Sequence, residues 1–184
     1  MPVLLAVSSA VVAAPTQWSA AAGGNGHYYD VIDASLTWED SRIAAEASSF
    51  LGTAGHLVSI TSAEENLFLT DTFGPENLDA HWIGLFQLPG SDEPDGGWTW
   101  TTGEPFSFSG WFPLEPNNGG GLEDRAMFQH PVQAFGKPWN DVVDGVSLGY
   151  VIEYPVMVPE PSAISMTVIG LFSLLVRRRI HPQD

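Results

Sequence analysis

The sequence has no cysteine among its 184 residues. Disulfides and thiolate metal ligands are therefore excluded, and the fold must be held together by packing, with or without a hard metal ion. Basic residues are also scarce, with 6 lysines and arginines against 22 acidic residues and a formal net charge of −16. Such a surface repels phosphates and anionic lipid head groups. It argues against a nucleic-acid-binding protein and favours the binding of cations.

The N-terminus lacks the positively charged leader that usually precedes the apolar core of a secretory signal. Residues 1–15 are nevertheless apolar or small, and they predict a signal peptide over residues 1–23. Small residues suited to a cleavage site occur twice, at residues 12–14 and at residues 20–22. The alternative interpretation of this stretch is a buried strand.

The C-terminal apolar stretch is too short for an ordinary membrane-spanning helix. It covers residues 163–176 and has 14 residues, whereas a spanning helix needs about 20. Three arginines follow at residues 177–179, and an apolar stretch that ends in basic residues is typical of membrane insertion with the basic end in the cytoplasm. The tail therefore predicts transient membrane insertion.

Oxygen-bearing side chains are concentrated between Trp111 and Asp144. They form three short clusters, which are Glu115 and Asn117 around Pro116, then Glu123, then the adjacent pair Asn140 and Asp141. Calcium binds six to eight oxygens from carboxylates, amide carbonyls, backbone carbonyls and water. No cysteine or histidine lies within the clusters, so a soft-metal site has little support. The pattern predicts a calcium site.

The order of the clusters, Glu-Pro-Asn, then Glu-Asp, then Trp-Asn-Asp, resembles the calcium and sugar site of C-type lectin-like domains. The apolar sequence Trp82-Ile83-Gly84-Leu85 adds to this resemblance, which covers residues 27–154 as one domain. It implies an α+β fold with two helices, small antiparallel sheets and a long irregular loop for calcium and ligand. Local signals agree, because Thr37 can cap a first helix, and Ser62 and Glu65 can form a capping box for a second.

Domains that share this resemblance usually carry two disulfides, and this chain has none. By motif spacing, Ala45 and Ile152 occupy one pair of positions, and Arg125 and Asp144 occupy the other. One pair has thus become apolar and the other has acquired opposite charges. We expect Arg125 and Asp144 to form an ion pair in place of the crosslink.

The resemblance also assigns roles to the side chains of the predicted site. It implies that calcium is bound by Glu115, Asn117, Glu123, Asn140 and Asp141, and that the first four also bind the sugar. Two neighbouring sugar hydroxyls would bind calcium, donate to the carboxylates and accept from the amide NH₂ groups. The order Glu-Pro-Asn is the mannose, glucose or fucose type of this family, opposite to the galactose type Gln-Pro-Asp. A cis bond before proline would bring the flanking side chains to one side.

Other residues near the site receive weaker assignments. Trp111 and Trp139 could stack on a sugar, but we expect them in the core. Some relatives have an auxiliary calcium site, which is not expected here. Gln87 stands where Asp would be needed, and the acidic loop over residues 92–95 has a different length.

Residues 155–184 resemble the PEP-CTERM sorting signal of bacteria, because the motif Pro159-Glu160-Pro161 precedes the apolar stretch and the arginines. The resemblance implies an exosortase-type enzyme that recognises and processes the tail. A plain C-terminal membrane anchor is the alternative. Both interpretations place the domain outside the cytoplasm, at the cell surface or in an extracellular matrix.

These observations predict an exported, calcium-dependent carbohydrate-binding module whose partner is a glycan or exopolysaccharide. The alternative is an adhesion or matrix structural protein that uses the same fold for other contacts. An enzyme, for instance a glycosidase, is not expected, because the sequence shows no nucleophile, base and orienting group together.

Overall fold

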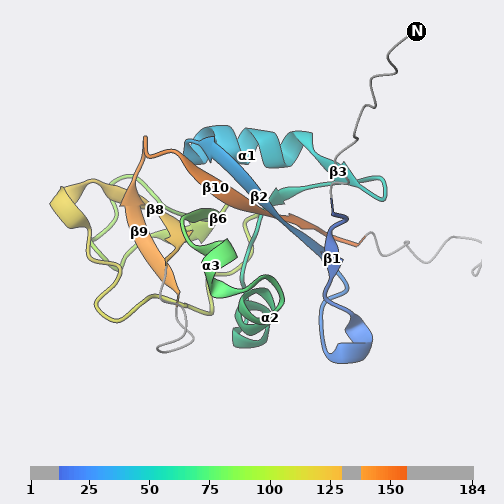
Figure 1. The fold of residues 1–184 in the computed structure, drawn as a ribbon. Coiled ribbons are helices and arrows are strands. Elements are labelled where there is room, and N and C mark those ends of the chain that lie inside the picture. Colours follow the sequence, from blue (N-terminus) through green and yellow to red (C-terminus); the bar gives the residue numbers. More distant parts are fainter. Residues whose placement is uncertain (1–12, 130–137, 157–184) are drawn as a thin grey trace, which may run out of the picture.

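A mixed sheet of eight strands forms the centre of the computed structural model, which describes residues 13–129 and 138–156 (Figure 1). The strand order is β1-β2-β10-β6-β8-β9, with β5 beside β10 and β7 beside β6. β10 and β6 are parallel, and the other neighbouring strands are antiparallel. The strands are β1 (Thr16–Gln17), β2 (Tyr28–Leu36), β5 (His56–Leu57), β6 (His81–Gln87), β7 (Trp98–Trp100), β8 (Glu123–Phe128), β9 (Trp139–Val143) and β10 (Leu148–Tyr154).

Two longer helices, α1 (Trp38–Ala47) and α2 (Ala63–Phe73), lie on opposite sides of this sheet (Figure 1). Each begins at the cap that the sequence predicts, which is Thr37 for α1 and Ser62 for α2. The remaining short elements are the 3₁₀ turns η1 (Ala20–Ala22) and η2 (Gly119–Gly121) and the hairpin of β3 (Ser49–Phe50) and β4 (Thr53–Ala54).

The α+β class is confirmed. The structure has one main mixed sheet, whereas the sequence predicts small antiparallel sheets, and it has a third helix. This helix, α3 (Pro75–Leu78), follows α2 directly, because Gly74 ends one and begins the other. Pro75 holds the first position of α3, where its missing N–H has no helical partner to lose. A Gly-Pro pair at the end of one helix thus also starts the next.

The core occupies both faces of the sheet, because side chains alternate in direction along its central strands. On β6, Ile83 and Leu85 join a buried cluster that includes Leu69 of α2. Trp82 points the other way and joins a second cluster that includes Trp38 of α1. Each of the two longer helices therefore covers one of the two clusters.

The positions of both missing crosslinks are filled by contacts. Ala45 in α1 and Ile152 in β10 are buried in the same apolar cluster. Arg125 Nη2 lies 3.6 Å from Asp144 Oδ2, which confirms the predicted ion pair. The guanidinium of Arg125 also lies 4.8 Å from the ring centroid of Trp38. Arg125 is therefore held by a cation–π contact as well as by the charge of Asp144.

We expect these two contacts of Arg125 to differ in strength. A double-mutant cycle with Arg125→Ala and Asp144→Ala should give a coupling energy of about 0–1 kcal/mol, because the Asp144 side chain is 45% exposed to water. Arg125→Ala alone should cost more, since it also removes the contact with Trp38 and the packing of its stem. Denaturant unfolding of the four proteins measures both quantities. A coupling energy as large as the whole loss in Arg125→Ala would contradict the role of Trp38.

The folded part of the chain begins before residue 27, where the resemblance places the start of the domain. β1 pairs with β2, and the ring of Trp18 stacks on Phe68 of α2 with centroids 5.5 Å apart. Signal cleavage at residues 20–22 would remove β1 and Trp18, whereas cleavage at residues 12–14 would leave both in place.

Parts of the predicted terminal signals lie outside the described residues. These parts are residues 1–12 of the signal peptide and residues 157–184, which carry the Pro-Glu-Pro motif, the apolar stretch and the arginines. Among the residues that the structure does describe, no helix is long and apolar enough to cross a membrane.

Candidate functional site

A long irregular segment joins β7 to β8 and carries the first predicted calcium ligands. Backbone contacts fasten it to β9, because Phe112 N donates to Trp139 O at 2.8 Å and Trp139 N donates to Gly110 O at 2.9 Å. Trp139 is fully buried, and its ring lies 5.9 Å from that of Trp111. Both rings therefore pack in the core, as predicted. The Glu115–Pro116 bond is cis, which the resemblance also predicts.

Asp141 on β9 anchors this segment. Its side chain is fully buried, and its carboxylate accepts hydrogen bonds from Asn117 N at 3.0 Å and from Asn118 N at 2.7 Å. Charge-assisted hydrogen bonds of this kind are stronger than neutral ones. One buried carboxylate thus holds the turn that follows the Glu-Pro-Asn motif.

Glu123 fastens the same turn from the side of β8. Its Oε2 accepts from Gly119 N at 2.6 Å, and its own N–H donates to Asn118 Oδ1 at 3.1 Å. Asn118 has a φ of 47°, a left-handed conformation that asparagine tolerates better than most residues. Sequence reasoning missed Asn118. The available signal was an asparagine before three glycines, a pattern typical of turns with positive φ.

Glu115 and Asn117 complete the group. Asn117 Nδ2 donates to Glu115 Oε2. Burial and the neighbouring carboxylate of Asp141 raise the pKa of Glu115 to about 7, and burial also raises the pKa of Glu123, with a further contribution from Asp141. The site therefore sets negative charges against one another, and a bound cation would relieve their repulsion.

The Oδ1 of Asn140, the remaining predicted ligand, makes no hydrogen bond to the other four. Asn140 precedes Asp141 on β9, and adjacent residues of a strand send their side chains to opposite faces. Its Oδ1 is buried and has no hydrogen-bond partner among the described residues. The structure thus brings together Glu115, Asn117, Glu123 and Asp141, and the role of Asn140 stays a prediction.

The donors of this group fit calcium chemically, since all are carboxylate or amide oxygens. The buried Oδ1 of Asn140 and the crowded carboxylates are features that a cation would satisfy. In the described ranges, however, no three acidic or histidine side chains are gathered closely enough to hold a metal ion. The carboxylates of Asp141 and Glu123 accept hydrogen bonds from backbone N–H groups of the turn. Calcium binding would require part of this hydrogen bonding to be exchanged for the ion.

Gln87 has a structural role at the position where some relatives would need Asp. Its side chain is buried, and its amide nitrogen donates to Pro94 O at 3.3 Å and to Gly96 O at 2.8 Å. The side-chain amide of Gln87 therefore holds the loop that precedes β7 through two hydrogen bonds that it donates.

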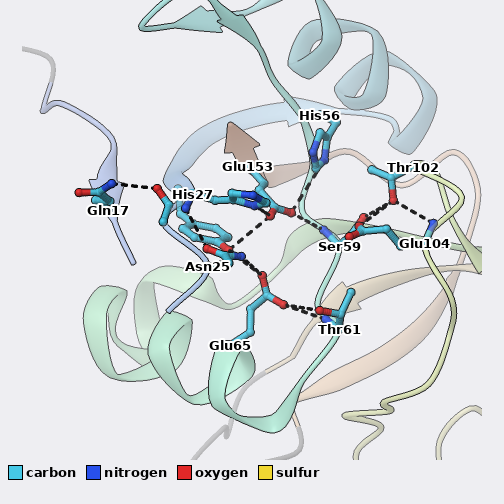
Figure 2. A network of polar contacts seen from close by, with 12 residues as sticks. Gln17, Asn25, His27, His56, Ser59, Thr61, Glu65, Thr102, Glu104 and Glu153 are labelled. Atoms are coloured by element: carbon cyan, nitrogen blue, oxygen red, sulfur yellow. Dashed lines mark hydrogen bonds and ion pairs between the residues drawn. The ribbon is translucent and has the colours of Figure 1, made fainter. Parts of the chain in front are cut away.

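A second polar cluster connects the N-terminal segment, α2 and β10 (Figure 2). Its centre is a pair of buried carboxylates, Glu65 and Glu153. Tyr29 donates its hydroxyl to Glu65 Oε1 at 2.6 Å, and His27 Nδ1 donates to Glu153 Oε1 at 2.6 Å. Backbone N–H groups of Ser59 and Thr61 donate to the other carboxylate oxygens.

Sequence reasoning missed this cluster, because its members come from distant parts of the chain. Glu65 was expected to complete a capping box with Ser62, but its carboxylate binds Thr61 and Tyr29 instead. Burial and then the charge of Glu153 raise the pKa of Glu65. The hydrogen bond to Glu153 raises the pKa of the remaining member, the His27 imidazole.

We expect this cluster to make the domain less stable as the pH rises. The stability that charged His27 contributes is present below its ordinary pKa of 6.5 and is lost as the pH rises through its raised folded-state pKa. Glu65 acts in the same direction, because the folded state keeps its proton to a higher pH than the usual 4.5. The difference in free energy of unfolding between the wild type and His27→Gln, about 1 kcal/mol at low pH, should shrink above the raised pKa. Thermal unfolding at a series of pH values measures it, and a difference independent of pH would contradict the expectation.

Comparison with known proteins places this geometry in a family. The model of the family described as Lectin C-type domain matches residues 35–152. The alpha-N-acetylgalactosamine-specific lectin of Patiria pectinifera is 30% identical over 130 residues, which cover 69% of this chain and 73% of that lectin. Halomucin of Haloquadratum walsbyi is 29% identical over 160 residues, or 74% of this chain. The match spans only 2% of halomucin and 23% of the low affinity immunoglobulin epsilon Fc receptor of Mus musculus.

Solved structures agree with the family match. The carbohydrate-recognition domain of cow CD23, crystallised in the presence of a GlcNAc2Man3 oligosaccharide, is 32% identical, with a TM-score of 0.56 over 71% of this chain and 89% of that domain. The EPNH mutant of the lectin CEL-I is 28% identical, with a TM-score of 0.60 over 77% of this chain and 96% of that protein. The chain therefore belongs to the C-type lectin domain family, and its α+β architecture is the C-type lectin fold without disulfides.

Proposed function

We propose that this domain is a calcium-dependent carbohydrate-binding module. The observation that carries the proposal is the group formed by Glu115, Asn117, Glu123 and Asp141, in which hydrogen bonds join one turn of the long loop to β8 and β9. Burial and then the charge of Asp141 raise the pKa of Glu115, and a cation among these carboxylates would favour their charged forms. Oxygen donors alone, with no thiolate available, favour calcium.

The residues of the group would have different roles in binding a sugar. Bound calcium would hold two neighbouring hydroxyl groups by their oxygen lone pairs. The carboxylates of Glu115 and Glu123 would accept hydrogen bonds from these hydroxyls, and the amide NH₂ groups of Asn117 and Asn140 would donate to their oxygens. Asp141, which is buried beneath the turn, keeps these groups in position.

We further propose a preference of the mannose, glucose or fucose type. Its support is the acid-first order of Glu115 and Asn117, together with the mannose-containing oligosaccharide named for the cow CD23 domain. Membership of the family does not by itself fix the sugar, because the relative from Patiria pectinifera is named for alpha-N-acetylgalactosamine. The order of the two side chains is therefore the feature to test.

Capture on immobilised sugars tests both proposals. The wild type should bind mannose beads in calcium and should elute with a chelator, and Glu115→Gln with Asn117→Asp should shift retention toward galactose beads. Asp95→Ala serves as the control, since Asp95 is an exposed acid of another loop. Retention on mannose beads that survives the chelator would favour an adhesion protein that does not depend on calcium.

We also propose that the module acts outside the cytoplasm, bound to a surface or matrix glycan. The support is the pattern of the two chain ends, which predicts a signal peptide and an exosortase-processed tail. A single shallow sugar site binds weakly, so several copies on a surface would be needed for useful avidity. A catalytic role is not proposed, since the relatives named here include lectins and the carboxylates of the site serve binding.

A further inference from the structure

A cleft of about 340 Å³ opens where β2, β10 and β6 lie side by side in the sheet (Figure 1). Asp33 of β2, His81 of β6 and Gly149 of β10 line it together. The group around Glu115 contributes no lining residue. The cleft is therefore separate from the candidate calcium site.

The imidazole of His81 has one ring nitrogen in a hydrogen bond and the other without a partner. His81 is only 6% exposed. Its Nδ1 lies 2.8 Å from Asp79 O, and because a carbonyl oxygen can only accept, Nδ1 carries the proton and donates it. Nε2 is buried and has no hydrogen-bond partner among the described residues. Such an atom is unfavourable in a folded protein unless a ligand satisfies it. The same donation by one ring nitrogen to a carbonyl orients histidines that bind metals through the other.

The carboxylate of Asp33 lies at the distance that a shared metal ion requires. Its Oδ1 is 3.5 Å from His81 Nε2, and its side chain is 99% exposed. In the part of the chain that the structure describes, no arginine or lysine pairs with Asp33. Two ligands that bind one tetrahedral zinc ion at about 2.1 Å each are about 3.4 Å apart. Both side chains could therefore bind one ion nearly where they stand.

Gly149 provides the space in which these two side chains meet. Leu148 pairs with Leu36 and Tyr150 pairs with Ile32, so three residues of β2, Asp33 among them, lie opposite Gly149 alone. A Cβ atom at this glycine would lie 2.4 Å from His81 Nε2. Gly149 is not among the glycines with positive φ, so its backbone conformation does not require glycine. The open space beside the ring nitrogen is what a larger residue would remove.

We propose that His81 Nε2 and Asp33 bind a divalent transition-metal ion in this cleft, and zinc is the probe for it. An imidazole nitrogen suits zinc and its neighbours in the transition series, whereas calcium and magnesium prefer oxygen ligands. Within residues 13–129 and 138–156, no third acidic or histidine side chain joins the pair as a ligand. Water would fill the remaining positions, and the affinity should be lower than that of a zinc site with four protein ligands. The ion would link β2 to β6 across β10 and thereby stabilise the sheet.

Calorimetric titration of the full chain with zinc chloride in saturating calcium tests the inference. The wild type should bind zinc saturably and should melt at a higher temperature in zinc, and magnesium should have neither effect. Loss of a partner that only orients a metal ligand weakens binding by about 10–100-fold, so loss of a ligand should cost at least about tenfold. We expect this loss in both Asp33→Asn and His81→Gln. Asp33 is fully exposed, so Asp33→Asn remains a valid test if the buried substitution impairs folding.

Three control variants distinguish this cleft from the other polar groups of the domain. His56→Gln removes a partly buried histidine whose Nδ1 also lies near a backbone carbonyl, Leu57 O at 2.9 Å, but which does not line the cleft. Asp95→Asn removes an exposed acid of another loop. Glu115→Ala removes a proposed calcium ligand. All three variants should keep the zinc affinity of the wild type.

The remaining outcomes would overturn the inference. A wild type that neither binds zinc nor changes its melting temperature would do so, as would zinc affinity of wild-type strength in Asp33→Asn. Zinc binding lost in Glu115→Ala but kept in Asp33→Asn would place the ion in the long loop. Binding lost in His56→Gln but kept in His81→Gln would place it in the cluster around Glu153. None of these results depends on whether the long loop binds calcium or sugar, so the inference and the proposed function can fail separately.

Discussion

Asp141→Ala is expected to abolish calcium binding and to lower the free energy of unfolding by about 1–3 kcal/mol. Asp141 is fully buried, and it is the acceptor for the N–H groups of Asn117 and Asn118. Its removal leaves both donors without their partner and releases the turn that carries the other proposed ligands. Part of the loss is offset, because the repulsion between Asp141 and Glu115 disappears as well.

Two further variants distinguish the effect on the stability of the loop from the effect on calcium binding. Asp141→Asn removes the charge and keeps an oxygen acceptor for only one of the two N–H groups, so it should lose most of the calcium affinity and a smaller part of the stability than Asp141→Ala. Asp95→Ala, an exposed acid in another loop, should change neither quantity. Calorimetric titration with calcium and denaturant unfolding measure the two effects. Calcium binding of wild-type strength in Asp141→Ala would exclude this residue from the site.

Trp139→Ala is expected to cause the largest loss of stability, about 3–5 kcal/mol. The side chain is fully buried, and its ring packs against Trp100, Phe108 and Trp111 with centroids 5.7, 5.6 and 5.9 Å away. Its Nε1 also donates to Asn66 Oδ1 at 3.0 Å. The substitution therefore leaves a large cavity and an amide oxygen without this donor.

Trp139 also helps to position the site, since the residues that follow it on β9 are Asn140 and Asp141. We therefore expect Trp139→Ala to weaken calcium binding, although its side chain is directed into the core. Trp111→Ala, which removes a half-buried ring, should cost less. Denaturant unfolding followed by circular dichroism compares the two variants, and a smaller loss in Trp139→Ala than in Trp111→Ala would contradict this description of the core.

The sequence predicts those features whose residues lie close together in the chain. Glu115, Asn117 and Glu123 lie within nine residues of one another, and the helix caps Thr37 and Ser62 precede their helices directly. The ion pair of Arg125 and Asp144 joins distant residues, and it could be predicted only because the resemblance names both positions. The α+β class follows from the same combination of local patterns and resemblance.

The contacts that the sequence does not reveal depend on tertiary structure. Glu65 and Glu153 are far apart in the chain, and nothing local indicates that folding buries both carboxylates around Tyr29. Asn118 was missed because its role, played by its backbone N–H, its side-chain Oδ1 and a left-handed φ, is to shape the turn. The role that the resemblance assigns to Asn140 stays a prediction, because its buried Oδ1 has no hydrogen-bond partner among the described residues.

The most direct test of the account is a calcium titration of the full chain, followed by heat and by melting temperature. The account predicts saturable binding at one site and, at a free calcium concentration of a hundred times the Kd, a stabilisation of about 2.7 kcal/mol. The same titration of Glu115→Ala should show neither. A wild type that binds no calcium and whose melting temperature does not change would contradict the proposal that these residues form a calcium site.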